Sequence, residues 1–135
     1  MILIVCVDDN KGMMFNHRRQ SQDRVLRADI LELTDGKKLW MNAYSRKQFA
    51  ESDAEKIRVD ETFLDAAGDG EFCFVENADV SGCVERIEEI YLYRWNRDYP
   101  AEVYFPVDLS VWKCVETKEF AGSSHEKITR ERYTC

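Results

Sequence analysis

The sequence predicts a layered α/β domain, and three observations favour this class. Residues 71–77 (EFCFVEN) contain a short apolar run without alternation, which is typical of a strand buried on both faces. Helical patterns at residues 59–67 and 79–89 flank this run, and a second strand pattern follows at residues 90–93. The order of helix, strand, helix and strand is typical of α/β architectures. We therefore expect residues 71–77 to form a central strand whose carboxyl end, at Glu76 and Asn77, faces a ligand crevice.

Length and composition indicate one domain spanning residues 1–135. With 135 residues, of which 44% are hydrophobic, the chain can bury one core but is too short for two ordinary domains. Its formal net charge of −7 argues against nucleic acid as a partner, because phosphate contacts need clustered Lys and Arg. The apolar run at residues 2–7 is too short for a signal peptide or a membrane span. It is expected to be the first buried strand, and no membrane partner is expected.

The cysteines and histidines argue against disulfides, metals and hydrolysis. Five Cys without a C-x-x-C pair are typical of reduced thiols in a cytoplasmic protein. His17 and His125 are the only histidines, and neither lies in a metal-binding spacing, so no metal site is expected. Ser124 and His125 form a Ser-His pair on one loop. Neighbours in sequence seldom adopt nucleophile–base geometry and the sequence shows no orienting acid, so hydrolysis is not expected.

The first 36 residues are predicted to contain a strand, a loop and a helix. Residues 13–20 mix apolar and cationic side chains without a period, and we expect them to be the most mobile loop. Ser21 has the chemistry of an N-cap for the helix that follows. The apolar stripe of this helix is Leu26, Ile30 and Leu33, and the helix is expected to end at residues 35–36.

From residue 38 onward, the chain is predicted to form short strands and helices, followed by a hairpin. Residues 38–41 are predicted as a strand, and Ser45 and Gln48 match a capping box that starts a helix ending near residue 51. A polar connection at residues 52–57 and a short helix at residues 60–67 follow. A further strand is expected at residues 102–105. The runs at residues 111–118 and 127–133 are expected to form an antiparallel hairpin near a sheet edge.

The order of several motifs resembles the dihydrofolate reductase family. Ile90-Tyr91-Leu92-Tyr93 is followed by Phe105-Pro106, Asp108-Leu109-Ser110 and Trp112, which is similar to the family's strand, acidic loop, Phe-Pro, acidic turn and Trp. Val59-Asp60-Glu61, Gly68-Asp69 and residues 72–75 resemble its helix and central strand. The resemblance covers the chain with one deletion of roughly twenty residues. It implies a three-layer α/β fold, with a central mixed sheet of about seven or eight strands flanked by helices, and a cleft between the first helix and the sheet.

The positions that would hold NADPH depart from the family. In the reductases the central strand ends in two glycines, whose bare backbone approaches the pyrophosphate, whereas this chain has Glu76 and Asn77 there. A carboxylate repels a pyrophosphate, and both side chains obstruct the approach. The Gly-Arg-x-Thr motif after the second strand is replaced by residues 42–45 (NAYS), of which Ser45 keeps a similar hydroxyl. The deletion falls between Phe49 and Val59, in part of the adenosine-binding region. We therefore expect no cofactor-binding residues.

The position of the catalytic acid departs as well. Counting back from Thr34 without a gap places Leu26 where the family has its catalytic carboxylate, and Tyr93 where it has the Thr that partners this acid. Asp23 could reach the same cleft if the alignment slips by three residues, because positions i and i+3 share a helix face. Asp23 is therefore the candidate catalytic residue. The alternative is that an acid early in a helix only favours the helix dipole.

Polar residues around the expected cleft form the candidate ligand site. Arg18 and Arg19 precede a helix N-terminus, where guanidinium groups, free N–H groups and the helix dipole all favour an anion or an amide. A solvated loop with surface arginines is the alternative. Because a buried carboxylate is costly unless paired, Glu76 is expected to contact either a ligand or one of these arginines. The candidate ligand-binding residues are Asn16, Arg18, Arg19, Gln20, Ser21, Tyr44, Ser45, Glu76, Asn77 and Tyr93.

Three functions remain open. We favour a divergent relative of the reductases that lacks ordinary NADPH-dependent dihydrofolate reduction and binds a small polar or anionic molecule in the cleft. The second function is NADPH-dependent reduction of a pterin-like or pyrimidine-like substrate. The third is a non-catalytic interaction protein with a vestigial cleft. A sheet edge exposed by the deletion would also allow a homodimer.

Overall fold

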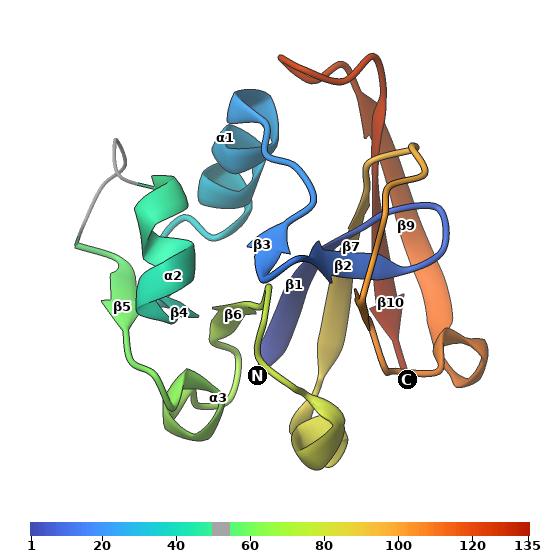
Figure 1. Cartoon of the computed structure of the whole chain (residues 1–135). Coiled ribbons are helices and arrows are strands. Elements are labelled where there is room, and N and C mark those ends of the chain that lie inside the picture. Colours follow the sequence, from blue (N-terminus) through green and yellow to red (C-terminus); the bar gives the residue numbers. More distant parts are fainter. Residues whose placement is uncertain (50–54) are drawn as a thin grey trace.

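A seven-stranded mixed sheet forms the centre of the structure, a computed structural model that describes residues 1–49 and 55–135 (Figure 1). The strand order is β5-β4-β6-β1-β7-β10-β9. Neighbours from β5 to β7 are parallel, whereas β10 is antiparallel to both β7 and β9. The strands are β1 (Ile2–Val7), β4 (Leu39–Met41), β5 (Ile57–Val59), β6 (Phe72–Phe74), β7 (Glu89–Arg94), β9 (Lys113–Phe120) and β10 (Ile128–Thr134). The expected mixed sheet with a C-terminal antiparallel hairpin is confirmed.

Alternate side chains of the central strands build a hydrophobic core on each face of the sheet. Leu3 and Val5 of β1 join Cys73 of β6 on one face, which α3 (Phe63–Ala66) and η2 (Ser81–Arg86) cover. Ile2 and Ile4 join Phe72 and Phe74 on the other face, which α1 (Arg24–Leu33) covers. All three residues of β6 are buried, as the unalternated apolar run predicts. The three-layer architecture is therefore confirmed.

The N-cap of helix α1 lies two residues after the predicted one. Its N-cap is Asp23, whose Oδ1 accepts hydrogen bonds from the N–H groups of Val25 and Leu26, so the assignment of Ser21 as N-cap was wrong. Both residue types can cap a helix, and the contacts of Asp23 with another loop decide between them. The stripe residues Leu26 and Ile30 are fully buried.

Among the described residues, no helix has the length and apolar character needed to cross a membrane.

The helix α2 (Ala43–Arg46) also begins at a different residue from the predicted one. Asn42 is its N-cap and accepts the Ser45 N–H, and α2 runs directly into η1 (Lys47–Phe49). The predicted capping box of Ser45 and Gln48 is therefore wrong, because both side chains donate to Glu76 at the end of β6 instead. The predicted end of this helix near residue 51 lies outside the described residues.

The segment predicted as an irregular loop is a hairpin within a second, three-stranded sheet. Its strands are β2 (Gly12–Phe15) and β3 (Arg18–Arg19), and β8 (Val103–Tyr104) pairs with the other side of β2. Asn16 and His17 form the turn with φ angles of 52° and 60°, a left-handed conformation that hairpin turns require. Pairing with the distant β8 gives this segment its strand character, which no local period reveals.

Three other predicted elements differ from the observed ones. The helix expected at residues 59–67 is split, because residues 57–59 form β5 and α3 spans only four residues. The helix expected at residues 79–89 is the 3₁₀ segment η2, which Cys83 interrupts with non-helical backbone angles. The described part of the polar connection at residues 52–57 ends in β5. A short 3₁₀ turn, η3 (Leu109–Val111), precedes the C-terminal hairpin.

Candidate functional site

The carboxylate of Glu76 at the end of β6 is buried and fully paired. Arg19 donates to it through two atoms, with Nε 2.8 Å from Oε2 and Nη2 3.1 Å from Oε1. The Ser45 hydroxyl donates to Oε1 at 2.8 Å, and the Gln48 amide donates to Oε2 at 3.2 Å. Only 8% of the Glu76 side chain is exposed, so these three donors replace the water that the charge loses.

Arg19 is fixed in turn by Tyr44. The guanidinium lies 4.4 Å from the centre of the Tyr44 ring, and the Arg19 backbone N–H donates to the Tyr44 hydroxyl at 2.8 Å. Burial alone would lower the pKa of Arg19, but its hydrogen bond to Glu76 raises the pKa above the usual value. Arg19 therefore stays charged, and its pairing with Glu76 occupies the place where the sequence predicted either a pairing or a ligand contact.

The candidate ligand residues lie around several cavities instead of one cleft, and three of these cavities border the β2–β3 hairpin or the residues after β6. The strand-end cavity, which includes Glu76, Arg19 and Ser21 in its lining, has a volume of about 10 Å³. The turn cavity, about 300 Å³, is lined by Met14, Asn16, His17, Asn77, Glu102 and Val103. The hairpin cavity, about 220 Å³, is lined by Phe15, Asn16, Arg18, Arg19, Gln20, Tyr99 and Pro100. Asp23, Tyr44, Ser45 and Tyr93 line none of these three. The strand-end cavity holds about one water molecule, so the space expected between the helix and the strand end is filled.

Asn77 takes part in a separate contact beside Glu76. Its Oδ1 accepts a hydrogen bond of 2.8 Å from Nδ2 of Asn42, the residue that caps α2. This contact ties the end of β6 to the start of α2. Two side chains of the predicted site, Glu76 and Asn77, therefore hold the same helix, while Asn77 also borders the turn cavity.

Tyr93 contacts an acid that the sequence analysis missed. Its hydroxyl donates to Oδ2 of Asp29 at 2.6 Å, and Arg130 and Lys118 each form a 2.8 Å ion pair with Asp29. Burial and the neighbouring Asp29 charge raise the pKa of the Tyr93 hydroxyl well above its usual value. The acid is therefore the ionised partner. One sequence signal could have revealed it, because Asp29 lies one residue before Ile30 and four before Leu33, on the apolar side of α1.

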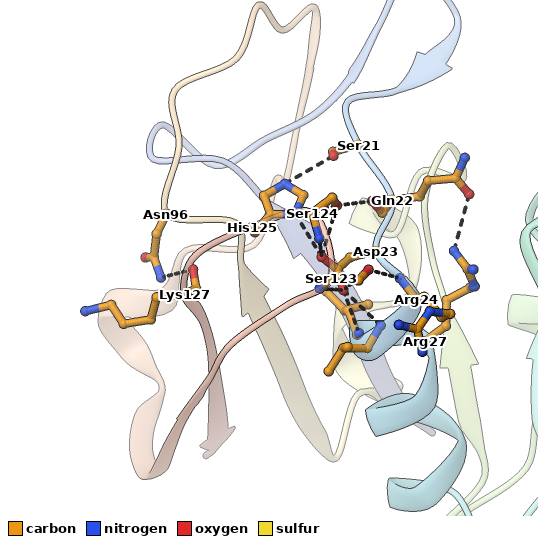
Figure 2. Close-up of polar contacts among 12 residues, drawn as sticks. Ser21, Gln22, Asp23, Arg24, Arg27, Asn96, Ser123, Ser124, His125 and Lys127 are labelled. Atoms are coloured by element: carbon orange, nitrogen blue, oxygen red, sulfur yellow. Dashed lines mark hydrogen bonds and ion pairs between the residues drawn. The ribbon is translucent and has the colours of Figure 1, made fainter.

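Asp23 does not lie beside Tyr93, and its carboxylate contacts the loop between β9 and β10 instead. Figure 2 shows its carboxylate among the side chains and amides of residues 123–125. The backbone N–H groups of Ser123 and Ser124 donate to it at 3.0 and 2.8 Å, and His125 Nδ1 lies 3.1 Å from Oδ2. Burial alone would raise the pKa of Asp23, but these hydrogen bonds lower it far below the ordinary value. Asp23 is therefore a carboxylate held beside a buried histidine.

Gly122 is required for this approach. A Cβ atom at Gly122 would lie 2.4 Å from Oδ2 of Asp23 and 2.8 Å from Cδ1 of Ile128, both too close for any side chain. The loop from Gly122 to His125 is thus shaped around the carboxylate. No group of three or more His, Cys, Asp or Glu side chains suited to a metal ion occurs in residues 1–49 and 55–135.

Comparisons with known proteins bear on the fold. No protein-family model and no curated protein sequence matches the chain. Among solved structures, it is similar to dihydrofolate reductase from Enterococcus faecalis in complex with NADP(H) and RAB-propyl, with a TM-score of 0.70 and 11% sequence identity. The match covers 98% of this chain and 94% of the reductase chain. The fold that the sequence resemblance implied is therefore confirmed, and the chain has a dihydrofolate reductase-like fold.

Replacing Arg19 with Met is expected to destabilise the protein, because Glu76 would remain buried without its ionic partner. We expect the free energy of unfolding, measured by urea denaturation, to fall by about 3 kcal/mol. Arg18→Met is the matched control, since Arg18 is exposed and should change stability by less than about 0.5 kcal/mol. Equal stabilities of the two variants would contradict a stabilising role of the pair.

Acid stability should depend on Asp29. Although burial raises its pKa, the bonds from Lys118, Tyr93 and Arg130 lower it below the ordinary 3.8. Since the folded state has the lower pKa, this group stabilises the protein above pH 3.8, and the contribution is lost as the pH falls through the folded value.

Asp29→Asn should therefore be less stable than the natural chain at pH 7, by about 2 kcal/mol. The gap in unfolding free energy should narrow as the pH falls below 4, where the natural chain loses the same contribution. Asp35→Asn, at an exposed position, is the control. A gap that stays constant from pH 7 to pH 3 would argue against the assignment.

Proposed function

We propose that this protein is a divergent dihydrofolate reductase-like protein that does not carry out ordinary NADPH-dependent dihydrofolate reduction and that binds a small anionic molecule in the hairpin cavity. The loss of NADPH-dependent reduction rests on one observation, the buried carboxylate of Glu76. It stands where the resemblance places bare glycine backbone. A dinucleotide phosphate there would meet a negative charge and a Cβ atom. The strand-end cavity of about 10 Å³ also leaves no room for a pyrophosphate.

The pairing of Arg19 supports the same conclusion. A guanidinium that donates two hydrogen bonds to Glu76 has its charge neutralised within the protein. It is therefore a poor substitute for the phosphate-binding arginine that residues 42–45 lack. Freeing it would require a ligand to compete with a bidentate ion pair that is already desolvated.

The hairpin cavity has the chemistry of an anion site. Arg18 is exposed, and its guanidinium has no hydrogen-bond or ion-pair partner among the described residues, so it is available to a ligand. Phe15, Tyr99 and Pro100 supply apolar walls. A volume of about 220 Å³ is below the range of drug-sized sites and suits a small carboxylate or phosphate compound.

NADPH titration tests the loss of the coenzyme. Because Glu76 occupies the phosphate position, we expect no saturable change of Trp fluorescence up to about 1 mM NADPH, which corresponds to a binding free energy weaker than about −4 kcal/mol. N-acetyltryptophanamide provides the inner-filter control. Saturable binding in the micromolar range would instead support an NADPH-dependent reductase of a pterin-like or pyrimidine-like substrate.

Titration with inorganic phosphate tests the anion site. We expect saturable NMR shifts of the amides of residues 15–20, and an affinity about tenfold weaker in Arg18→Gln because a charge-assisted hydrogen bond is lost. Arg97→Gln is the matched control, since it removes the same charge at another exposed position. If the phosphate affinity falls equally in both variants, the binding reflects only general charge attraction. If neither phosphate nor NADPH binds, the non-catalytic interaction protein becomes the better proposal, with an outer strand of the sheet as the edge that a homodimer would cover.

A further inference from the structure

His125 connects an acid and two hydroxyl groups that are far apart in the sequence. Its Nδ1 lies 3.1 Å from Oδ2 of Asp23, and its Nε2 lies 3.2 Å from the Ser21 hydroxyl and 3.0 Å from the Tyr99 hydroxyl. Figure 2 shows the ring between Asp23 on one side and Ser21 on the other. The sequence offered no acid to orient this histidine, because Asp23 precedes it by about a hundred residues.

The hydrogen bonds of Asp23 determine the tautomer of His125. The carboxylate already receives the N–H groups of Ser123 and Ser124 and is an acceptor only, so Nδ1 of His125 must carry the ring proton. The Ser124 hydroxyl, 3.0 Å from Nδ1, is also within 3.0 Å of both Asp23 Oδ2 and the Gln22 carbonyl, to which it can donate. In the neutral form of the ring, Nε2 then carries the lone pair, which faces the hydroxyls of Ser21 and Tyr99. This is the protonation state of a general base.

The ring is also fixed in orientation. It stacks on Trp95 with ring centres 4.5 Å apart and planes at 25°, and only 4% of His125 is exposed. The Gly122 N–H donates to the His125 carbonyl at 3.0 Å, which closes the loop beneath the ring. A base held by stacking on one side and an acid on another loses little entropy when it acts.

Ser21 is the accessible member of the set. It is partly exposed, and it borders the strand-end cavity of about 10 Å³, whereas Asp23 and His125 are buried. Tyr99 lines the adjoining hairpin cavity of about 220 Å³. The backbone N–H groups of Ser21 and Gln22 donate to no group among the described residues, so they are free to donate to a bound substrate.

We propose that Ser21, His125 and Asp23 form a hydrolytic triad, with Ser21 as the nucleophile, for carboxylic esters with a small acyl group. The strand-end cavity holds only about one water molecule, so the ester would occupy the adjoining hairpin cavity of about 220 Å³, whose size favours a small acyl group. This activity goes beyond the proposed anion binding and does not depend on it, because a neutral ester would serve as substrate.

The reaction takes two steps. Oγ of Ser21 attacks the ester carbonyl while Nε2 of His125 takes its proton; the bond to the alcohol oxygen then breaks, and His125 returns the proton to that oxygen. Acyl-Ser21 and the free alcohol result. Water next attacks the acyl carbon and gives a proton to His125, which passes it to Oγ of Ser21 as the acyl–oxygen bond breaks and the carboxylic acid leaves. No oxidant, metal or further reactant is consumed.

A structural role for the same contacts is the competing explanation, since they join the start of α1 to the loop between β9 and β10. The two roles differ in one property, the nucleophilicity of Ser21. A residue that only packs would not react with an electrophile, whereas an activated serine displaces fluoride from a fluorophosphonate and keeps the phosphorus.

The test uses the full natural chain with a biotinylated fluorophosphonate, followed by peptide mapping, and p-nitrophenyl acetate as substrate. We expect the label on Ser21 and a loss of hydrolysis of at least about 100-fold in Ser21→Ala and in His125→Gln. Ser110→Ala, on η3 and outside the network, is the matched control and should hydrolyse at the rate of the natural chain. Circular dichroism checks that each variant is folded.

Tyr99→Phe separates the two hydroxyls that share the lone pair of Nε2. Because it removes the competitor of Ser21, the reaction of Ser21 with the fluorophosphonate should be faster in this variant than in the natural chain. A natural chain that takes no label at Ser21 would overturn the triad, whether or not the variants fold. Equal rates of ester hydrolysis for the natural chain and a folded Ser21→Ala would overturn it as well.

Discussion

The buried ion pair between Arg19 and Glu76 is the constraint on which the arrangement around the strand end depends. A carboxylate taken out of water costs several kcal/mol unless donors surround it. Here the donors come from three elements: Arg19 of β3, Ser45 of α2 and Gln48 of η1. The hairpin of β2 and β3 must therefore fold over the end of β6. The same requirement explains why Asn42 caps α2, since the hydroxyl that could have capped a later helix start is committed to Glu76.

The helix α1 is held by two further carboxylates, and both take their partners from the C-terminal hairpin. Asp23 at its start accepts from Ser123 and Ser124, and Asp29 in its middle pairs with Lys118 and Arg130. These contacts draw the helix and the hairpin together. Together with the buried side chains of Leu26 and Tyr93, they fill the space in which the sequence predicted a cleft. The two larger cavities that the candidate ligand residues line, the turn cavity and the hairpin cavity, lie around the β2–β3 turn.

The parts of the fold that could be predicted from the sequence are those that local pattern determines. The buried runs of β1 and β6 and the hairpin of β9 and β10 have apolar patterns and turn residues that no distant contact needs to correct. Cap positions could not be predicted in this way. Ser21 and Asp23 are equally suited to start α1, and amides about a hundred residues later select Asp23.

The candidate site shows the same division. Glu76 could be singled out from the sequence because the resemblance places a glycine at this position, and its pairing with an arginine was one of the two expected outcomes. Asp29 was missed because its partners come from β7, β9 and β10, which only the folded sheet brings together. His125 was set aside since its acid and its hydroxyl partners are both remote in sequence. In each case the missing information is a tertiary contact, and the local pattern is compatible with more than one answer.

Tyr99 links the proposed anion site in the hairpin cavity with the proposed triad of Ser21, His125 and Asp23. Its hydroxyl shares Nε2 of His125 with Ser21, while its ring borders the hairpin cavity beside Arg18. An anion bound to Arg18 that attracts the Tyr99 hydroxyl would leave the lone pair of Nε2 to Ser21 alone. Because coupling between two sites is reciprocal for binding, an acylated Ser21 would in turn change the affinity of the cavity for the anion. The proposed anion site and the proposed nucleophile thus share Tyr99, which borders the hairpin cavity and contacts His125.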